Sequence, residues 1–224
     1  MSEAKWIGIS AGRKNKVTET VIKTVLKAAN KNYDFYSLSD FEILSCDGCN
    51  GCVESHRCVK NDRLNEISEA MQEAEGIVFG APEYWGGMNA KGRAFWERIC
   101  FSTRHNEYFP LADKPAVLIG VSGDGDSSGV IQDCTEFLED ARMKIIEKIE
   151  IRGEYACFDC GYGHLCQVGG LKNFYNLPVK AEELERKRLS EQKLREEIDY
   201  SKIKAICEEL REIQAEKGAE EKCK

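Results

Sequence analysis

The sequence lacks any long apolar run, and this absence limits where the protein can act. No stretch approaches the roughly 20 consecutive apolar residues that a membrane-spanning helix needs. Residues 1–16 also contain no apolar core of the kind that secretory signals carry. We therefore expect a cytoplasmic protein without a membrane partner.

The chain also lacks an excess of positive charge. It carries 32 Lys and Arg against 39 Asp and Glu, a net charge of -7, with both signs mixed along its 224 residues. This balance argues against a general affinity for nucleic acid or anionic membranes. No internal repeat or low-complexity linker is present either. The hydrophobic fraction of 42% supports a packed core, and the length fits one α/β domain with an extension.

Cysteine, by contrast, is abundant. The chain has 11 cysteines, an odd number, and most of them fall in clusters. In a reducing compartment they are not expected to form a disulfide framework. Clustered cysteines in such a protein indicate metal binding or redox chemistry.

Strand-like and helix-like segments alternate along the first two thirds of the chain. Short apolar runs predict buried strands at residues 5–10, 33–38, 76–81, 115–122 and 145–155. Apolar residues at helical spacing predict helices at residues 18–29, 62–74, 90–100 and 131–142. Such alternation is typical of a parallel sheet with helices on both faces.

Five strands favour a flavodoxin-like, doubly wound α/β fold with the strand order 2-1-3-4-5. We assign this domain to residues 1–156. A ligand of such a sheet lies beyond the carboxyl ends of its strands. The loops after strands one, three and four should therefore form the binding site.

Each of these three loops has the composition of a ligand loop. Residues 10–18 are small and polar, carry three cations and enter a helix N-terminus, which suits a phosphate. Residues 82–87 present two aromatic side chains beside glycines, and residues 122–129 are rich in glycine. Any one of them also fits an ordinary turn. Together, a phosphate end and an aromatic end favour FMN over a dinucleotide. The candidate FMN-binding residues are Ser10, Arg13, Asn15, Val17, Thr18, Pro82, Glu83, Tyr84, Trp85, Gly86, Ser122, Gly123 and Gly125.

A compact group of four cysteines follows the second predicted strand. Cys46, Cys49, Cys52 and Cys58 have the spacing C-x2-C-x2-C-x5-C, with glycines in the short gaps. Four thiolates suit an iron–sulfur cluster, and they also suit tetrahedral zinc. Zinc sites more often use two separated C-x2-C pairs, so the continuous run favours a cluster. A loop without metal is the third interpretation.

At these residues the chain resembles the iron–sulfur flavoprotein family, a branch of the flavodoxin-like NAD(P)H-dependent FMN reductases. The resemblance covers about residues 5–142. Residues 8–18 are similar to the family's phosphate loop G-I-S-x-S-P-R-K-x-x-x-T, and the four cysteines are similar to its compact cluster motif. A further segment matches at Pro82, Tyr84, Gly86, Ala90, Ala94 and Arg98.

This resemblance implies FMN, a [4Fe–4S] cluster on the four cysteines, and a homo-oligomer, either a dimer or a tetramer, in which cluster and FMN meet across an interface. Because the cysteine loop follows strand two, we expect it at the same sheet edge as the loop at residues 10–18.

A second cysteine group, Cys157, Cys160 and Cys166, lies in a knuckle-like segment that we assign to residues 157–179. The C-x2-C-G-Y pattern resembles a rubredoxin or zinc-ribbon knuckle and makes this group a candidate second metal site. Its fourth ligand would have to be His164, Cys100, Cys134 or a cysteine of another subunit. A reactive dithiol and ordinary buried cysteines remain open interpretations.

Residues 180–224 form a tail rich in Glu, Lys and Arg. Leucine and isoleucine recur there, mostly at three- to five-residue spacing. This pattern predicts one or two amphipathic helices that pack on the domain or on a second subunit.

Three functions compete at this point. The first is an electron-transfer flavoprotein that takes electrons from a ferredoxin-like or NAD(P)H donor and passes them to a small acceptor. The second is an NAD(P)H-dependent FMN or quinone reductase whose cysteine loop holds no cluster. The third is a metal-stabilised, non-enzymatic module that binds a partner. The sequence shows no obvious general acid or base, which suits flavin chemistry because the cofactor performs the difficult step.

Overall fold

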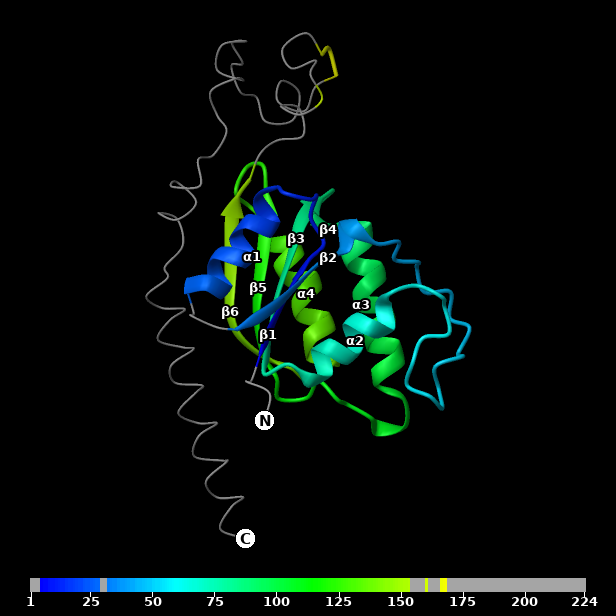
Figure 1. Ribbon diagram of the computed structural model, residues 1–224. Coiled ribbons are helices and arrows are strands. Elements are labelled where there is room, and N and C mark those ends of the chain that lie inside the picture. The colour runs from blue at the N-terminus through cyan, green and yellow to red at the C-terminus, as the bar shows by residue number, and fades with distance from the viewer. Residues whose placement is uncertain (1–4, 29–31, 154–159, 161–165, 169–224) are drawn as a thin grey trace, which may run out of the picture.

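A central parallel sheet organises the computed structural model, which describes residues 5–28, 32–153, 160 and 166–168 (Figure 1). Its strands lie in the order β2-β1-β3-β5-β6. Without the short β4, which pairs antiparallel with β3, this is the predicted 2-1-3-4-5 order, and the flavodoxin-like fold is confirmed. The strands are β1 (Trp6–Ser10), β2 (Tyr33–Ser37), β3 (Gly76–Tyr84), β4 (Gly87–Met88), β5 (Pro115–Ser122) and β6 (Lys144–Arg152).

Helices cover both faces of this sheet. One hydrophobic cluster joins a face of the sheet to α1, and a second joins the opposite face to α2, α3 and α4. The helices are α1 (Val17–Ala28), α2 (Leu64–Glu73), α3 (Ala90–Thr103) and α4 (Ser128–Asp140), with single 3-10 turns η1 (Leu38–Asp40) and η2 (His105–Glu107). No helix in the described part of the chain combines the length and the apolar character that a membrane crossing needs.

Glycines in two strands let α1 approach the sheet closely. A Cβ at Gly8 would lie 2.6 Å from Leu26, and a Cβ at Gly80 would lie 2.9 Å from Ile22. On the other face, Phe95 and Trp96 of α3 pack in the core against Phe79 of β3. These contacts fix α1, which carries Val17 and Thr18 of the candidate site, and α3, which begins just after β4.

The third strand and its loop differ from the sequence prediction. Pro82, Glu83 and Tyr84 were expected in a loop, but they continue β3, and the chain then reverses into β4. The reversal uses Trp85 at φ 59° and Gly86 at φ 79°, and positive φ at both central residues is typical of tight hairpins. The Pro82 carbonyl oxygen accepts the Asn89 N–H at 3.3 Å. Helix α4 also begins earlier than predicted, at Ser128.

Several predictions lie outside the described residues. These are the tail at residues 180–224, most of the knuckle-like segment at 157–179, and the domain boundary at 156. Of the second cysteine group, Cys160 is exposed and Cys166 is half-buried, while Cys157 is not described. The candidate second metal site therefore stays a prediction.

Candidate functional site

The three predicted FMN loops meet at one edge of the sheet. In adjacent parallel strands, Ser10 pairs with Gly80 and Pro82 pairs with Val121, so the carboxyl ends of β1, β3 and β5 lie at the same edge of the sheet. The Ala11 N–H donates to the Gly80 carbonyl oxygen at 2.8 Å. The sheet therefore juxtaposes the loops as the sequence predicted.

The first loop is a tight cradle that leads into α1. The hydroxyl of buried Ser10 accepts the Gly12 N–H at 3.2 Å. A Cβ at Gly12 would lie 2.6 Å from Thr18, so the loop folds onto the first turn of α1, which begins at Val17. Asn15, at φ 56°, donates its N–H to buried Glu19 at 2.9 Å. A helix N-terminus presents N–H groups without intrahelical partners, and this one fits a phosphate group.

The hairpin between β3 and β4 presents aromatic surface to solvent. Trp85 is 98% exposed and Tyr84 is 49% exposed. The Glu83 carboxylate accepts the Gly86 N–H at 2.6 Å, so it ties the two ends of the turn together. A non-glycine residue at positive φ is uncommon, and such conformations cluster at functional sites. An exposed aromatic pair on a fixed turn fits a flat ring.

The third candidate loop, at residues 122–129, is held against this hairpin. The Ser122 hydroxyl accepts the N–H of Gly125, which lies at φ 98°; Gly123 falls between them. At the start of α4, a Cβ on Gly129 would lie only 2.1 Å from the Gly86 carbonyl oxygen. Only glycine permits this approach of helix to turn. These close contacts bring the second and third candidate loops together, and all three fit the FMN they predict.

Asn89 links the hairpin to the first loop. It is the N-cap of α3, and its side-chain oxygen accepts the Gly92 N–H at 3.3 Å. Its side-chain NH₂ donates to the Ala11 carbonyl oxygen at 2.8 Å. The amide therefore satisfies a helix end and fixes the loop beside it. Sequence reasoning missed this residue, although an Asn directly before a predicted helix is a usable N-cap signal.

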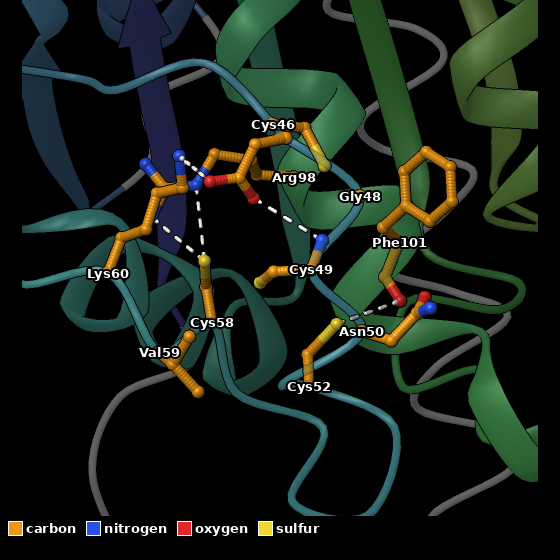
Figure 2. A pocket seen from close by; sticks show the side chains of 11 residues that line it. Cys46, Gly48, Cys49, Asn50, Cys52, Cys58, Val59, Lys60, Arg98 and Phe101 are labelled. Carbon is orange, nitrogen blue, oxygen red and sulfur yellow. Dashed lines mark hydrogen bonds and ion pairs between the residues drawn. The ribbon is translucent and has the colours of Figure 1, made fainter.

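The four cysteines of the loop at residues 46–58 line one pocket beside α3 (Figure 2). Arg98 and Phe101 of α3 and Lys60 complete its wall. The Cys52 thiol donates a weak hydrogen bond to the Phe101 carbonyl oxygen at 3.7 Å. The pocket residues are Cys46, Asp47, Gly48, Cys49, Asn50, Cys52, Cys58, Val59, Lys60, Arg98 and Phe101.

Burial and crowding oppose the ionisation of the Cys52 thiol. Burial raises the pKa of Cys52, and the neighbouring Cys58, Cys49 and Cys46 raise it further. Four thiolates in one pocket repel one another unless a positive centre lies between them. The donor set is therefore the one expected for a soft cation or an iron–sulfur cluster.

A single metal ion is not favoured by the geometry. Among the described residues, no group of three or more His, Cys, Asp or Glu side chains converges on one ion position. Four thiols around one pocket are the donor set that an iron–sulfur cluster takes.

A buried ion pair between Arg98 and Asp62 lies next to Cys58. Arg98 and Asp62 have side chains only 1% and 4% exposed. Burial alone would raise the pKa of Asp62, but hydrogen bonds from Arg98 and from two backbone N–H groups outweigh it and hold that pKa below its ordinary value. The Arg98 guanidinium also donates to the Cys58 sulfur, at 3.3 Å from Nε and 3.0 Å from Nη2.

Asn65 of α2 fixes the backbone of Cys58. Its side-chain oxygen accepts the Cys58 N–H at 3.0 Å, and its NH₂ donates to the Cys58 carbonyl oxygen at 2.8 Å. Cys58 is thus held by α2 through its backbone and by α3 through its sulfur. Cys49, by contrast, is exposed on the loop.

The cysteine loop does not stay at the sheet edge where we expected it. It leaves that edge at η1, where the Lys14 ammonium pairs with Asp40. The four cysteines then lie beside Arg98 and Phe101, whereas α3 begins at Ala90 near the FMN loops. At 1.5 Å per residue, this spacing along the helix is roughly 12–16 Å. The long connection from β2 to α2 carries the cysteines down α3 instead.

Comparison with known proteins shows which family this chain belongs to. The family of NADPH-dependent FMN reductases matches residues 4–151. An iron–sulfur flavoprotein of Methanocaldococcus jannaschii is 34% identical over 139 residues, 59% of this chain and 70% of that protein. The chain belongs to the NADPH-dependent FMN reductase family, and within it to the iron–sulfur flavoproteins. An iron–sulfur flavoprotein of Methanosarcina thermophila is 30% identical over 148 residues, 63% of this chain and 76% of that protein.

Solved structures share the fold at low sequence identity. A flavone reductase superposes with a TM-score of 0.57 and 16% identity, over 94% of this chain and 64% of that one. The azoreductase AzrA superposes with a TM-score of 0.56 and 14% identity, over 90% of this chain and 100% of that one. Family membership makes the protein an FMN-dependent oxidoreductase.

Proposed function

We propose that this protein is an electron-transfer flavoprotein that holds a [4Fe–4S] cluster on Cys46, Cys49, Cys52 and Cys58. The observation that carries the proposal is the single pocket that all four thiols line. Thiolates are the usual ligands of such clusters. The relatives named iron–sulfur flavoproteins support the same assignment.

In this proposal FMN binds at the sheet edge. Ser10, Thr18 and the N-terminus of α1 receive the phosphate, with Arg13 nearby as a cation. Tyr84 and Trp85 face the flavin ring, and the loop from Ser122 to Gly125 offers backbone groups to it. FMN supplies both hydride and single-electron chemistry, and the protein's task is to orient it and keep it bound.

The proposed function passes electrons between a ferredoxin-like or NAD(P)H donor and a small acceptor such as a quinone, dioxygen or peroxide. In this proposal the two sites lie at different points along α3, and electrons pass between sites on different subunits of a homo-oligomer, either a dimer or a tetramer.

The test is to purify the protein anaerobically and measure iron, acid-labile sulfide, zinc and FMN per chain. About four irons with matching sulfide and one FMN are expected for a [4Fe–4S] flavoprotein. Cys49→Ala should lose the iron and keep FMN. Cys100→Ala, the same change at a buried cysteine outside the pocket, should keep both.

Other results would favour the competing functions. FMN without iron or sulfide would reduce the protein to an NAD(P)H-dependent FMN or quinone reductase. Zinc in place of iron would make the cysteine loop structural. Protein with neither FMN nor iron would contradict the site assignments and leave the non-enzymatic module.

A further inference from the structure

The guanidinium of Arg98 is saturated with partners inside the protein. Two of its N–H groups point to the Cys58 sulfur, two bond the carboxylate of Asp62, and one donates to the Leu44 carbonyl oxygen at 3.1 Å. An arginine has five such donors in a fixed plane. The side chain is therefore held rigidly, and its orientation toward sulfur is determined by Asp62.

A neutral thiol at Cys58 would be too weak a hydrogen-bond acceptor for this arrangement. A thiol sulfur is only a weak acceptor, yet it receives two bonds from a buried cation. Bonds between ionised partners are shorter and about twice as strong as neutral ones. The two donors are therefore suited to a metal-bound Cys58 sulfur, which carries negative charge.

Burying an ion pair for stability alone is a weak explanation for Arg98. The desolvation cost of two buried charges often exceeds what their attraction returns. Lys60, the other cation that lines the pocket, is directed elsewhere: it donates to the Ser45 carbonyl oxygen at 2.7 Å and pairs with Asp47 at 3.0 Å. Of these two cations of the described pocket, Arg98 is the one that bonds a cysteine sulfur.

We propose that Arg98 is a positioning residue that retains the cluster at Cys58 and raises its reduction potential, an inference that rests on the proposed function. Hydrogen bonds to ligand sulfurs are a recognised control of cluster potential. Because reduction adds negative charge, donors aimed at a ligand sulfur favour the reduced state. Asp62 serves this role indirectly, by fixing the plane of the guanidinium.

The test compares anaerobically purified variants by redox titration monitored by electron paramagnetic resonance, and by the rate of iron release to a chelator. Arg98→Gln removes the cation and its fork of donors. Arg98→Lys keeps the charge but not the planar fork. Lys60→Gln is the matched control, because it removes one pocket cation without removing a bond to sulfur.

We expect Arg98→Gln to lower the cluster potential and to weaken cluster retention by roughly 10- to 100-fold, the usual cost of losing an outer-shell partner. Arg98→Lys should fall between wild type and Arg98→Gln. Lys60→Gln should shift both quantities less than Arg98→Gln does. A purely structural arginine would change stability but leave the potential of the remaining clusters at the wild-type value.

Arg98→Gln leaves Asp62 buried without its cation, so this variant can fail to fold. The double variant Asp62→Asn with Arg98→Gln replaces the pair by two neutral amides and should show the same lowered potential. Wild-type potential in the folded variants, with iron and sulfide present, would overturn the role of Arg98 alone. Wild-type protein without iron and sulfide would overturn this inference and the proposed cluster together.

Discussion

Gly129→Ala probes the contact between α4 and the β3–β4 turn at the proposed FMN site. Its Cβ would lie 2.1 Å from the Gly86 carbonyl oxygen and 2.8 Å from the Gly86 carbonyl carbon. Ordinary contact begins at 3.4 Å, so helix and turn must separate by about 1.3 Å. The turn cannot withdraw freely, because the Met88 N–H is bonded to Asp133 of α4 at 2.8 Å.

Overpacking of this kind costs about 1–3 kcal/mol, while alanine in place of glycine returns up to about 1 kcal/mol of helix propensity. We therefore expect Gly129→Ala to lower stability by up to about 2 kcal/mol. Because the proposed FMN site includes this turn, the same cost should weaken FMN binding by up to roughly 30-fold. Thermal unfolding of apoprotein and fluorescence titration with FMN measure the two effects.

Gly92→Ala is the matched control, because Gly92 also lies in the first turn of a helix. Its Cβ would meet the Met88 sulfur at 2.7 Å and the Asn89 side-chain oxygen at 3.0 Å. A methionine side chain can move aside, and the second contact needs a shift of only a few tenths of an ångström. This variant should keep wild-type FMN affinity and stability within about 1 kcal/mol. Wild-type FMN affinity and stability in Gly129→Ala would refute the reasoning about the turn.

Three further predictions follow from single groups. The folded-state pKa of Asp62 is lowered, so its contribution to stability is complete above its unfolded pKa of about 3.9 and is lost as pH falls through the folded value. Asp62→Asn should flatten the fall of stability in denaturant unfolding as the pH drops below about 3.9; an unchanged slope there would contradict the assignment. Burial raises the pKa of Cys100 to about 12, so Cys100 in native protein at pH 8 should resist alkylation by iodoacetamide. The exposed Cys49 should react once iron is removed. Mass spectrometry of the labelled peptides measures both, and alkylation of native Cys100 would contradict the prediction. Glu83→Gln keeps an acceptor for the Gly86 N–H but a weaker one, so FMN affinity should fall a few-fold, by up to about 1 kcal/mol, and affinity equal to wild type would remove Glu83 from the site.

The order of elements could be read from the sequence because strand and helix periodicities are local. The run from Pro115 to Ser122 is buried along its whole length, as a central parallel strand should be. The parallel order then follows from general rules of connection. The cysteine spacing is equally local, and it is enough to place four thiols on one loop.

The hairpin at Trp85 was harder to predict. Proline cannot donate to a sheet ladder and is disfavoured in a central strand, yet β3 continues through Pro82 to Tyr84. The turn needs positive φ at Trp85, which sequence statistics disfavour. Contacts with α4, at Gly129 and Asp133, hold it there. These contacts belong to the tertiary structure alone.

By itself, the sequence determined the fold class, the three loops at the carboxyl edge and the four thiols, because each depends on composition or spacing over a short stretch. Tertiary structure decided what surrounds those thiols. Arg98 is 36 residues from Asp62 and 40 from Cys58, and only the packing of α3 against the loop brings them together. Arg98 lies between the core residues Trp96 and Ile99 of α3, and a charge at such a position in the sequence indicates a buried, paired side chain. Its partners could not be identified, because burial and pairing of a charge depend on the whole fold.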